Sequence, residues 1–297
     1  MSKSESIRKK EKLVVDDTAQ IEFRQVRNFS AIITATYHFQ RQNFRNLLWQ
    51  ILFIMGPLIV FLSVYKTYFF TIPVERDYAS FQLNQLIPSL PLYTIVFITF
   101  LIYSSVIYAY IVLYMDNGFD QFETMDVLKI AAINLPKAFG FSIVSSIFIL
   151  VATTVFILPG VYIAVPLTLG LIIIFREKMG IFETITRCFK IISGHWWQTF
   201  GIILITFFAI YLISLAVSFP EAIVDFALAG NFPEKADMSN WKALSLTLSV
   251  ITTLISFVFY SIGYVSIALQ YFNLVEQKEV YGLLKRIESI EKSERGK

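Results

Sequence analysis

Apolar runs of about 20 residues without charged side chains recur along the chain, separated by polar or amphipathic segments. A run of this length crosses the hydrocarbon core of a bilayer as an α-helix. The pattern therefore predicts an all-α polytopic membrane protein with six transmembrane helices. We expect the spans at residues 47–65, 92–114, 138–158, 161–175, 197–218 and 244–264, with the last helix free to continue to residue 271.

Amphipathic segments stand beside these spans, and the clearest covers residues 180–201. Apolar residues recur there at three- and four-residue steps, at Ile181, Ile185, Cys188 and Ile192. This spacing is typical of the apolar face of a helix. Gly194 is placed to end the helix, and Trp196 and Trp197 lead into the fifth span. We expect this helix to lie in the membrane interface, with Cys188 packed on its apolar side.

Similar amphipathic patterns cover residues 21–43 and 116–137, and a further helix is expected at 276–294. That last helix is charged on most sides but has one apolar stripe, formed by Val280, Leu283, Leu284, Ile287 and Ile290. The domain organisation predicted is a flexible cytoplasmic tail (1–20), a six-span membrane domain (21–275) and a cytoplasmic C-terminal helix (276–297).

An internal repeat is suggested by the tripeptide Phe-Glu-Thr, which occurs at 122–124 and again at 182–184. Lys-Ile and later Phe-Gly follow each copy at nearly equal spacing. In both places an amphipathic helix precedes a pair of spans, and the N-terminal third has the same order. We interpret the chain as three helix-plus-hairpin units. The alternative is a chance match between apolar helices of low complexity.

Prolines predict three irregularities in the spans. Gly56-Pro57 is expected to kink the first span, and Pro159-Gly160 to form the turn between the third and fourth. Pro166 is expected to kink or break the fourth span, whose fifteen residues cover only about 22 Å of a core of roughly 30 Å. The turn either lies below the outer surface, where broken helices build solute sites, or is a tight hairpin with local bilayer thinning.

Composition and charge agree with a membrane protein. Hydrophobic residues make up 56% of the chain and charged residues 16%, whereas soluble domains have about 25% charged residues. Of the 25 Lys and Arg residues, 21 fall on the side that holds both termini and four on the other side. The positive-inside rule places both termini in the cytoplasm. One cysteine excludes an internal disulfide.

Candidate catalytic chemistry is sparse. His38 and His195 both stand at an interface, where amphipathic anchoring explains them better than general-base catalysis. An acidic cluster precedes the third span and is explained by a solvated helix start; it contains Asp116, Asp120, Glu123 and Asp126. The predicted spans contain no Asp, Glu, Lys, Arg or His, which argues against an ion-coupled pump. We predict no enzyme, no cofactor, no metal site and no nucleic-acid partner.

A basic face is the candidate binding surface. Arg187 and Lys190 are three residues apart and project from nearly the same side of a helix. They are able to reach the headgroup level, with Trp196 and Trp197 fixing the depth. The hypothesis is that this face binds acidic lipid headgroups or an acidic partner. The alternative is that these charges only enforce orientation in the membrane.

A family resemblance rests on one set of residues: Leu158-Pro159-Gly160, then Thr184, Arg187 and Gly194, and finally Trp196-Trp197. This pattern resembles the membrane domain of glycerophosphodiester phosphodiesterases and related multi-pass bacterial proteins, over roughly residues 25–275. Cys188 stands where the family pattern has serine, and no segment here is long enough for the soluble catalytic barrel. The resemblance implies an integral module of a bacterial inner membrane, without the phosphodiesterase activity.

Three functions remain open from the sequence. The first is a non-enzymatic scaffold or assembly partner, or a lipid-organising module, which contacts a partner through the C-terminal helix. The second is a channel or carrier for a small or lipidic solute, and the third is a lipid-modifying enzyme.

Overall fold

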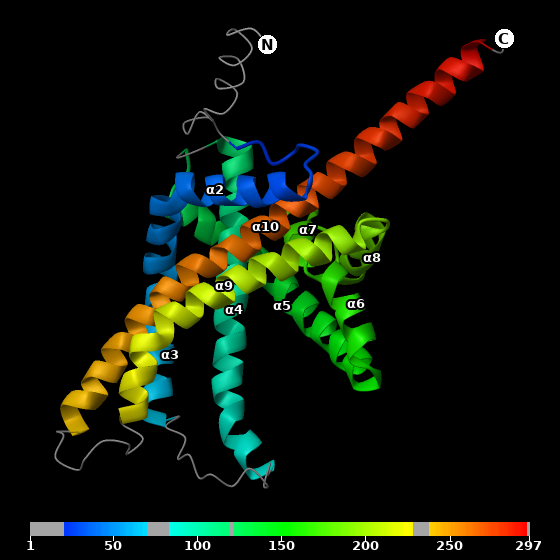
Figure 1. Ribbon diagram of the computed structural model, residues 1–297. Helices are drawn as coiled ribbons and strands as arrows, with labels where there is room; N and C mark the ends of the chain where they lie inside the picture. The colour runs from blue at the N-terminus through cyan, green and yellow to red at the C-terminus, as the bar shows by residue number, and fades with distance from the viewer. Residues whose placement is uncertain (1–20, 70–82, 119–120, 228–237, 296–297) are drawn as a thin grey trace, which may run out of the picture.

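The computed structural model describes residues 21–69, 83–118, 121–227 and 238–295, which form helices and no strand (Figure 1). The elements are α2 (Phe29–Gln50), η1 (Ile51–Met55), α3 (Gly56–Phe69), α4 (Leu83–Asn117), α5 (Thr124–Val155), α6 (Ile157–Leu167), α7 (Gly170–Glu177), α8 (Ile181–Ile192), α9 (Trp196–Phe226) and α10 (Met238–Arg295). Six stretches of the described chain are long and apolar enough to cross a membrane: Phe29–Tyr65, Leu90–Asn117, Thr124–Val155, Ile157–Glu177, Trp196–Phe226 and Ala243–Glu279. The prediction of an all-α polytopic protein is confirmed. The predicted tail at 1–20 lies outside the described residues.

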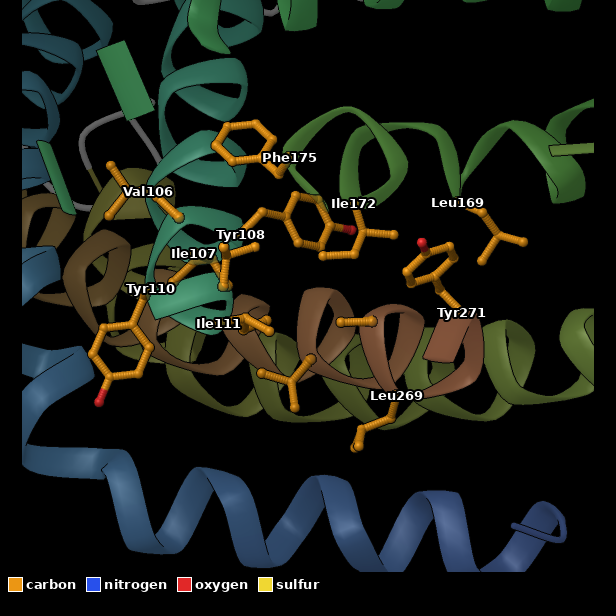
Figure 2. Packing of buried hydrophobic residues seen from close by; sticks show 14 of the residues in the cluster. Val106, Ile107, Tyr108, Tyr110, Ile111, Leu169, Ile172, Phe175, Leu269 and Tyr271 are labelled. Atoms are coloured by element: carbon orange, nitrogen blue, oxygen red, sulfur yellow. The ribbon is translucent and has the colours of Figure 1, made fainter. Parts of the chain in front are cut away.

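Helix α4 stands in the centre of the fold and contributes more buried core residues than any other described helix (Figure 1). Its buried side chains meet those of α7 and α10, including Tyr108 against Phe175, as Figure 2 shows. Two buried tyrosine hydroxyls on α4 bond to groups on other helices. Tyr110 donates to Asn43 Oδ1 at 2.8 Å, and Tyr103 donates to the carbonyl of Phe257. Because these hydroxyls are satisfied, large aromatic residues are buried without an unpaired polar group.

The first predicted span merges with the amphipathic segment before it. Asn28 accepts the N–H of Ala31 at 2.9 Å and so caps α2, which runs across the top of the molecule before the chain turns down towards α3 (Figure 1). The expected interfacial helix (21–43), from Phe29 onwards, and the expected span (47–65) are therefore parts of one continuous helical stretch. Instead of a simple proline kink, the π-helical turn η1 precedes Gly56 and Pro57.

The turn between the third and fourth spans lies at Phe156, and the prediction of a turn at Pro159-Gly160 is wrong. Phe156 has extended backbone (φ −157°, ψ 148°) between α5 and α6. Pro159 is the third residue of α6, where the missing N–H costs nothing because the first turn has no intrahelical acceptors. At Gly160, α6 approaches α5 closely. A Cβ there would lie 2.1 Å from Thr153 Oγ1 and 3.1 Å from Thr153 Cα.

Two further boundaries differ from the prediction. Residues 124–137 of the amphipathic segment and most of the span 138–158 form one helix, α5, which continues through Pro136 to Val155. The fifth span does not end at residue 218, because α9 continues through Pro220 to Phe226. The break expected near Pro166 is present, since α6 ends at Leu167 and α7 begins at Gly170.

The amphipathic segment 180–201 contains the predicted helix. Helix α8 covers Ile181–Ile192, and Gly194 ends it with a φ of +82°, a conformation that glycine adopts without steric cost. Cys188 is fully buried on the apolar face of α8, as expected. The proposed repeat partners differ in structure, however. Glu183 lies inside α8 and accepts the N–H of Gly180 at 3.0 Å, whereas Glu123 precedes α5 and donates its own N–H to Asp126.

Helix α10 joins the predicted sixth span to the predicted C-terminal helix without a break. It contains 58 residues and packs against α2, α3, α4, α8 and α9. At 1.5 Å per residue its length is about 87 Å, almost three times the thickness of a bilayer core. Figure 1 shows its last turns running out beyond the other helices. The predicted boundary at residue 275 is therefore not a break in the helix.

Candidate functional site

The polar centre of the molecule is an ion-pair cluster between α7, α8 and α10. Arg187 on α8 donates from Nε to Glu177 Oε2 at 3.0 Å and from Nη2 to Glu177 Oε1 at 3.0 Å. The same Nη2 donates to Glu279 Oε1 of α10 at 2.7 Å. The side chains of Arg187 and Glu177 are only 20% and 16% exposed. The two parallel hydrogen bonds form a bidentate guanidinium–carboxylate pair. This geometry fixes the orientation of the two side chains and also pairs their charges.

Two contacts with α10 complete the cluster. Tyr271 donates its hydroxyl to Glu177 Oε1 at 2.7 Å, and Lys278 Nζ donates to the carbonyl of Lys190 at 2.6 Å. The second contact places a positive charge at the C-terminal end of α8, where free carbonyls and the helix dipole favour it. We call Glu177, Arg187, Tyr271, Lys278 and Glu279 the α8 clamp, because they hold α8 to both α7 and α10.

The charges in the α8 clamp stabilise one another. Burial disfavours the charged form of Arg187, but its hydrogen bonds to Glu177 and Glu279 outweigh this effect and raise the pKa above its ordinary value. The neighbouring Cys188 has no such partner, and burial raises the pKa of its thiol to about 12. Arg187 therefore stays charged at every physiological pH, beside a thiol that stays protonated.

The four residues of the predicted basic face lie in different surroundings. Arg187 faces two carboxylates, and Lys190 is exposed. Trp196 is stacked on Tyr162 and donates its indole N–H to the carbonyl of that residue at 3.1 Å. Trp197 is 78% exposed. Of the pair, Trp197 has the surroundings of an interfacial anchor, while Trp196 joins α9 to α6.

Sequence spacing gave no signal for the contacts of the α8 clamp. Glu177 and Tyr271 are 94 residues apart, and both occur in runs where a charge or a tyrosine marks an ordinary membrane interface.

The acidic residues predicted as one cluster before the third span make separate contacts. Asp116 pairs with Arg176 at 2.6 Å, and Asp126 accepts the N–H of Glu123 at 3.1 Å; Asp120 lies outside the described residues.

A second polar network ties the first described residues to the bundle. The backbone N–H of Arg27 donates to Asn273 Oδ1 at 2.8 Å, and Asn273 donates to Gln270 at 3.1 Å. Gln270 in turn donates to Thr199 of α9 at 2.9 Å. The guanidinium of Arg27 donates to backbone carbonyls of its own segment, and burial lowers its pKa. This network holds the segment before α2 against α9 and α10.

The extension of α9 brings acidic residues into a membrane-length helix. Glu221 is 7% exposed and accepts the hydroxyl of Thr252 at 2.5 Å, and Asp225 accepts that of Ser245 at 2.8 Å. The predicted fifth span, which ends at residue 218, contains no acidic residue. Helix α9 continues to Phe226 and so includes Glu221 and Asp225. These contacts join the far ends of α9 and α10.

Two open grooves border α9 and α10. One, of about 500 Å³, lies beneath α2, and the other, of about 630 Å³, lies between α4, α9 and α10. Their walls are mainly apolar. Over the stretches that the structure describes, no group of three His, Cys, Asp or Glu side chains is arranged to hold a metal ion.

Comparison of the chain with family models, curated proteins and solved structures found no match in any of the three. The resemblance to the membrane domain of glycerophosphodiester phosphodiesterases therefore stays a prediction from the residues that carry it.

Proposed function

We propose that this protein is a non-enzymatic scaffold of a bacterial inner membrane, and that α10 connects its membrane domain to a partner. The observation that supports this role is the continuity of α10. One helix contains the last span, contacts five other helices and extends beyond them. A rigid helix of this kind holds whatever binds its end at a fixed distance and angle from the membrane.

The α8 clamp supports the same proposal, because it contains the last contacts of α10 with another helix among the side chains that the structure describes. Glu279 and Lys278 contact α8 from the turn immediately before residue 280. Under the positive-inside rule this end of α10 is cytoplasmic, so the partner is a cytoplasmic protein or the cytoplasmic part of a membrane protein. The clamp then sets the direction in which the helix leaves the membrane.

The experiment is a comparison of crosslinked complexes from native membranes. The full chain is purified beside a chain ending at Glu279 and beside the variant Ile287→Asp/Ile290→Asp, which interrupts the apolar stripe expected from the sequence. A partner that copurifies in fixed ratio with the full chain, and is lost from both others, supports the scaffold. Glu288→Gln, which lies off the stripe, is expected to retain it. Equal recovery from all four proteins contradicts the proposal.

A further inference from the structure

The groove beneath α2 has the shape of a site for one hydrocarbon chain. It lies where α2 crosses α9 and α10, and its volume of about 500 Å³ is within the usual range for ligand sites. Apolar side chains of all three helices form its walls: Ile33, Tyr37 and Phe44 of α2, Ile205 of α9, and Phe259 and Ile262 of α10.

The floor of the groove offers little polarity to a ligand. Gln40 donates to the carbonyl of Val258 at 3.3 Å and accepts the hydroxyl of Ser261 at 3.0 Å. Thr36 donates its hydroxyl to the carbonyl of Ile32 at 2.8 Å. These groups use their hydrogen bonds within the protein. The surface left for an occupant is therefore hydrocarbon, and a polar solute would lose its hydration there without compensation.

The rim of the groove carries positive charge. Arg41 lines the groove and is exposed, and Arg45 lies exposed one helical turn further along α2. A guanidinium binds phosphate oxygens in pairs, which makes arginine well suited to a phosphodiester. Tyr37 and Phe44, 62% and 48% exposed, flank the opening of the groove. An apolar slot with a cationic rim matches a molecule with an acyl chain and an anionic headgroup.

We propose that this groove binds one anionic glycerophospholipid, with an acyl chain between α2 and the α9–α10 pair and the phosphate at Arg41. This site is separate from the α8 clamp, whose arginine faces Glu177 and Glu279, and it does not depend on the scaffold role. The contact of acidic headgroups with Arg187 and Lys190 that the sequence suggests stays a separate prediction.

The test uses the full chain in mixed micelles with photoreactive lipids that carry a diazirine on one acyl chain. Phosphatidylglycerol is the anionic probe and phosphatidylcholine the zwitterionic one, and labelled peptides are mapped by mass spectrometry. We expect phosphatidylglycerol to label peptides of α2, α9 and α10 around the groove. Arg41→Gln is expected to lower that labelling about fivefold, which corresponds to the roughly 1 kcal/mol of one basic residue near an anionic lipid.

Three further variants decide between this site and general charge attraction. Arg41→Lys keeps most of the labelling, and Arg24→Gln, which removes an exposed charge outside the groove, keeps all of it. Ala209→Phe fills the groove and reduces labelling by both lipids; Ala209→Leu replaces it if the larger residue prevents folding. Gel-filtration profile and unfolding temperature establish that each variant is folded. Equal losses in Arg24→Gln and Arg41→Gln, or unchanged labelling in a folded Ala209 variant, overturn the proposal.

Discussion

The guanidinium of Arg187 and the carboxylate of Glu177 are ten residues apart and face each other across the corner between α7 and α8, with two N–O distances of 3.0 Å. Both side chains are at least four-fifths buried. The pair closes the connection between the end of a membrane helix and the start of an amphipathic one. The angle at which α8 lies against the bundle therefore depends on a side-chain contact as well as on the short connection.

Replacing Arg187 by Gln is expected to lower the free energy of unfolding by about 2–3 kcal/mol, since it leaves the mostly buried carboxylate of Glu177 without its charged partner. Glu177→Gln is expected to cost less, because the amide oxygen still accepts. Reversible unfolding in mixed detergent micelles measures both changes.

Lys190→Gln is the matched control, because its side chain is exposed and only its carbonyl takes part in the clamp. We expect a change within about 0.5 kcal/mol, as for other surface substitutions. The double variant Glu177→Gln/Arg187→Gln should cost less than the sum of the single variants. Additive costs would show that the two residues act independently.

Gly160→Ala is expected to lower stability by about 1–3 kcal/mol, because its Cβ would overlap Thr153 and force α5 and α6 apart. The control is Gly263→Ala in α10, where the new Cβ meets Ile210 Cδ1 at an ordinary 3.4 Å and gains helix propensity. Unfolding curves measured side by side should show a lower free energy of unfolding for Gly160→Ala than for Gly263→Ala. A neutral Gly160→Ala would rule out the close approach at this hairpin.

Cys188 should resist N-ethylmaleimide at pH 8 while the protein is folded, since reaction needs the thiolate and a pKa of about 12 keeps the thiol protonated. Raising the pH to 10 should not restore reactivity, whereas unfolding should. A thiol whose pKa is raised on folding stabilises the folded state fully below its unfolded pKa of about 9, and this contribution is lost between there and about 12.

The control for alkylation is Ser193→Cys in a Cys188→Ser background, which places a thiol at an exposed position five residues along the chain. Mass spectrometry should find it modified within the time in which Cys188 is not. Rapid modification of Cys188 in the folded protein would mean that α8 opens away from the bundle.

Topology is tested by reporter fusions. Those after Ser4, Asn134 and Gly296 should report the cytoplasm, and those after Asp77 and Asn231 the outside, because the Lys and Arg bias is 21 to four. Protease protection in oriented vesicles gives an independent measurement. A cytoplasmic signal after Asn231 would contradict six crossings.

The sequence alone was sufficient for features that depend on neighbouring residues. Six apolar stretches follow from local hydropathy, because crossing a bilayer is a property of about 20 consecutive residues. The face of α8 and its end at Gly194 follow from spacing and from the backbone freedom of one glycine. The break after Pro166 is equally local, since proline removes one hydrogen bond of its own helix. The turn at Phe156 was missed, because proline early in a helix is as favourable as proline in a turn.

Tertiary structure decided which helices are buried and which polar groups meet. The apolar windows in Leu90–Asn117 and Thr124–Val155 have mean hydropathies of 2.2 and 2.1, yet 67% of one and 17% of the other is buried. In a bilayer, lipid and protein interior are both apolar, so hydropathy does not distinguish a central helix from a peripheral one. The contacts of Arg187 with Glu177 and Glu279, and of Glu177 with Tyr271, likewise require helices distant in sequence to pack side by side.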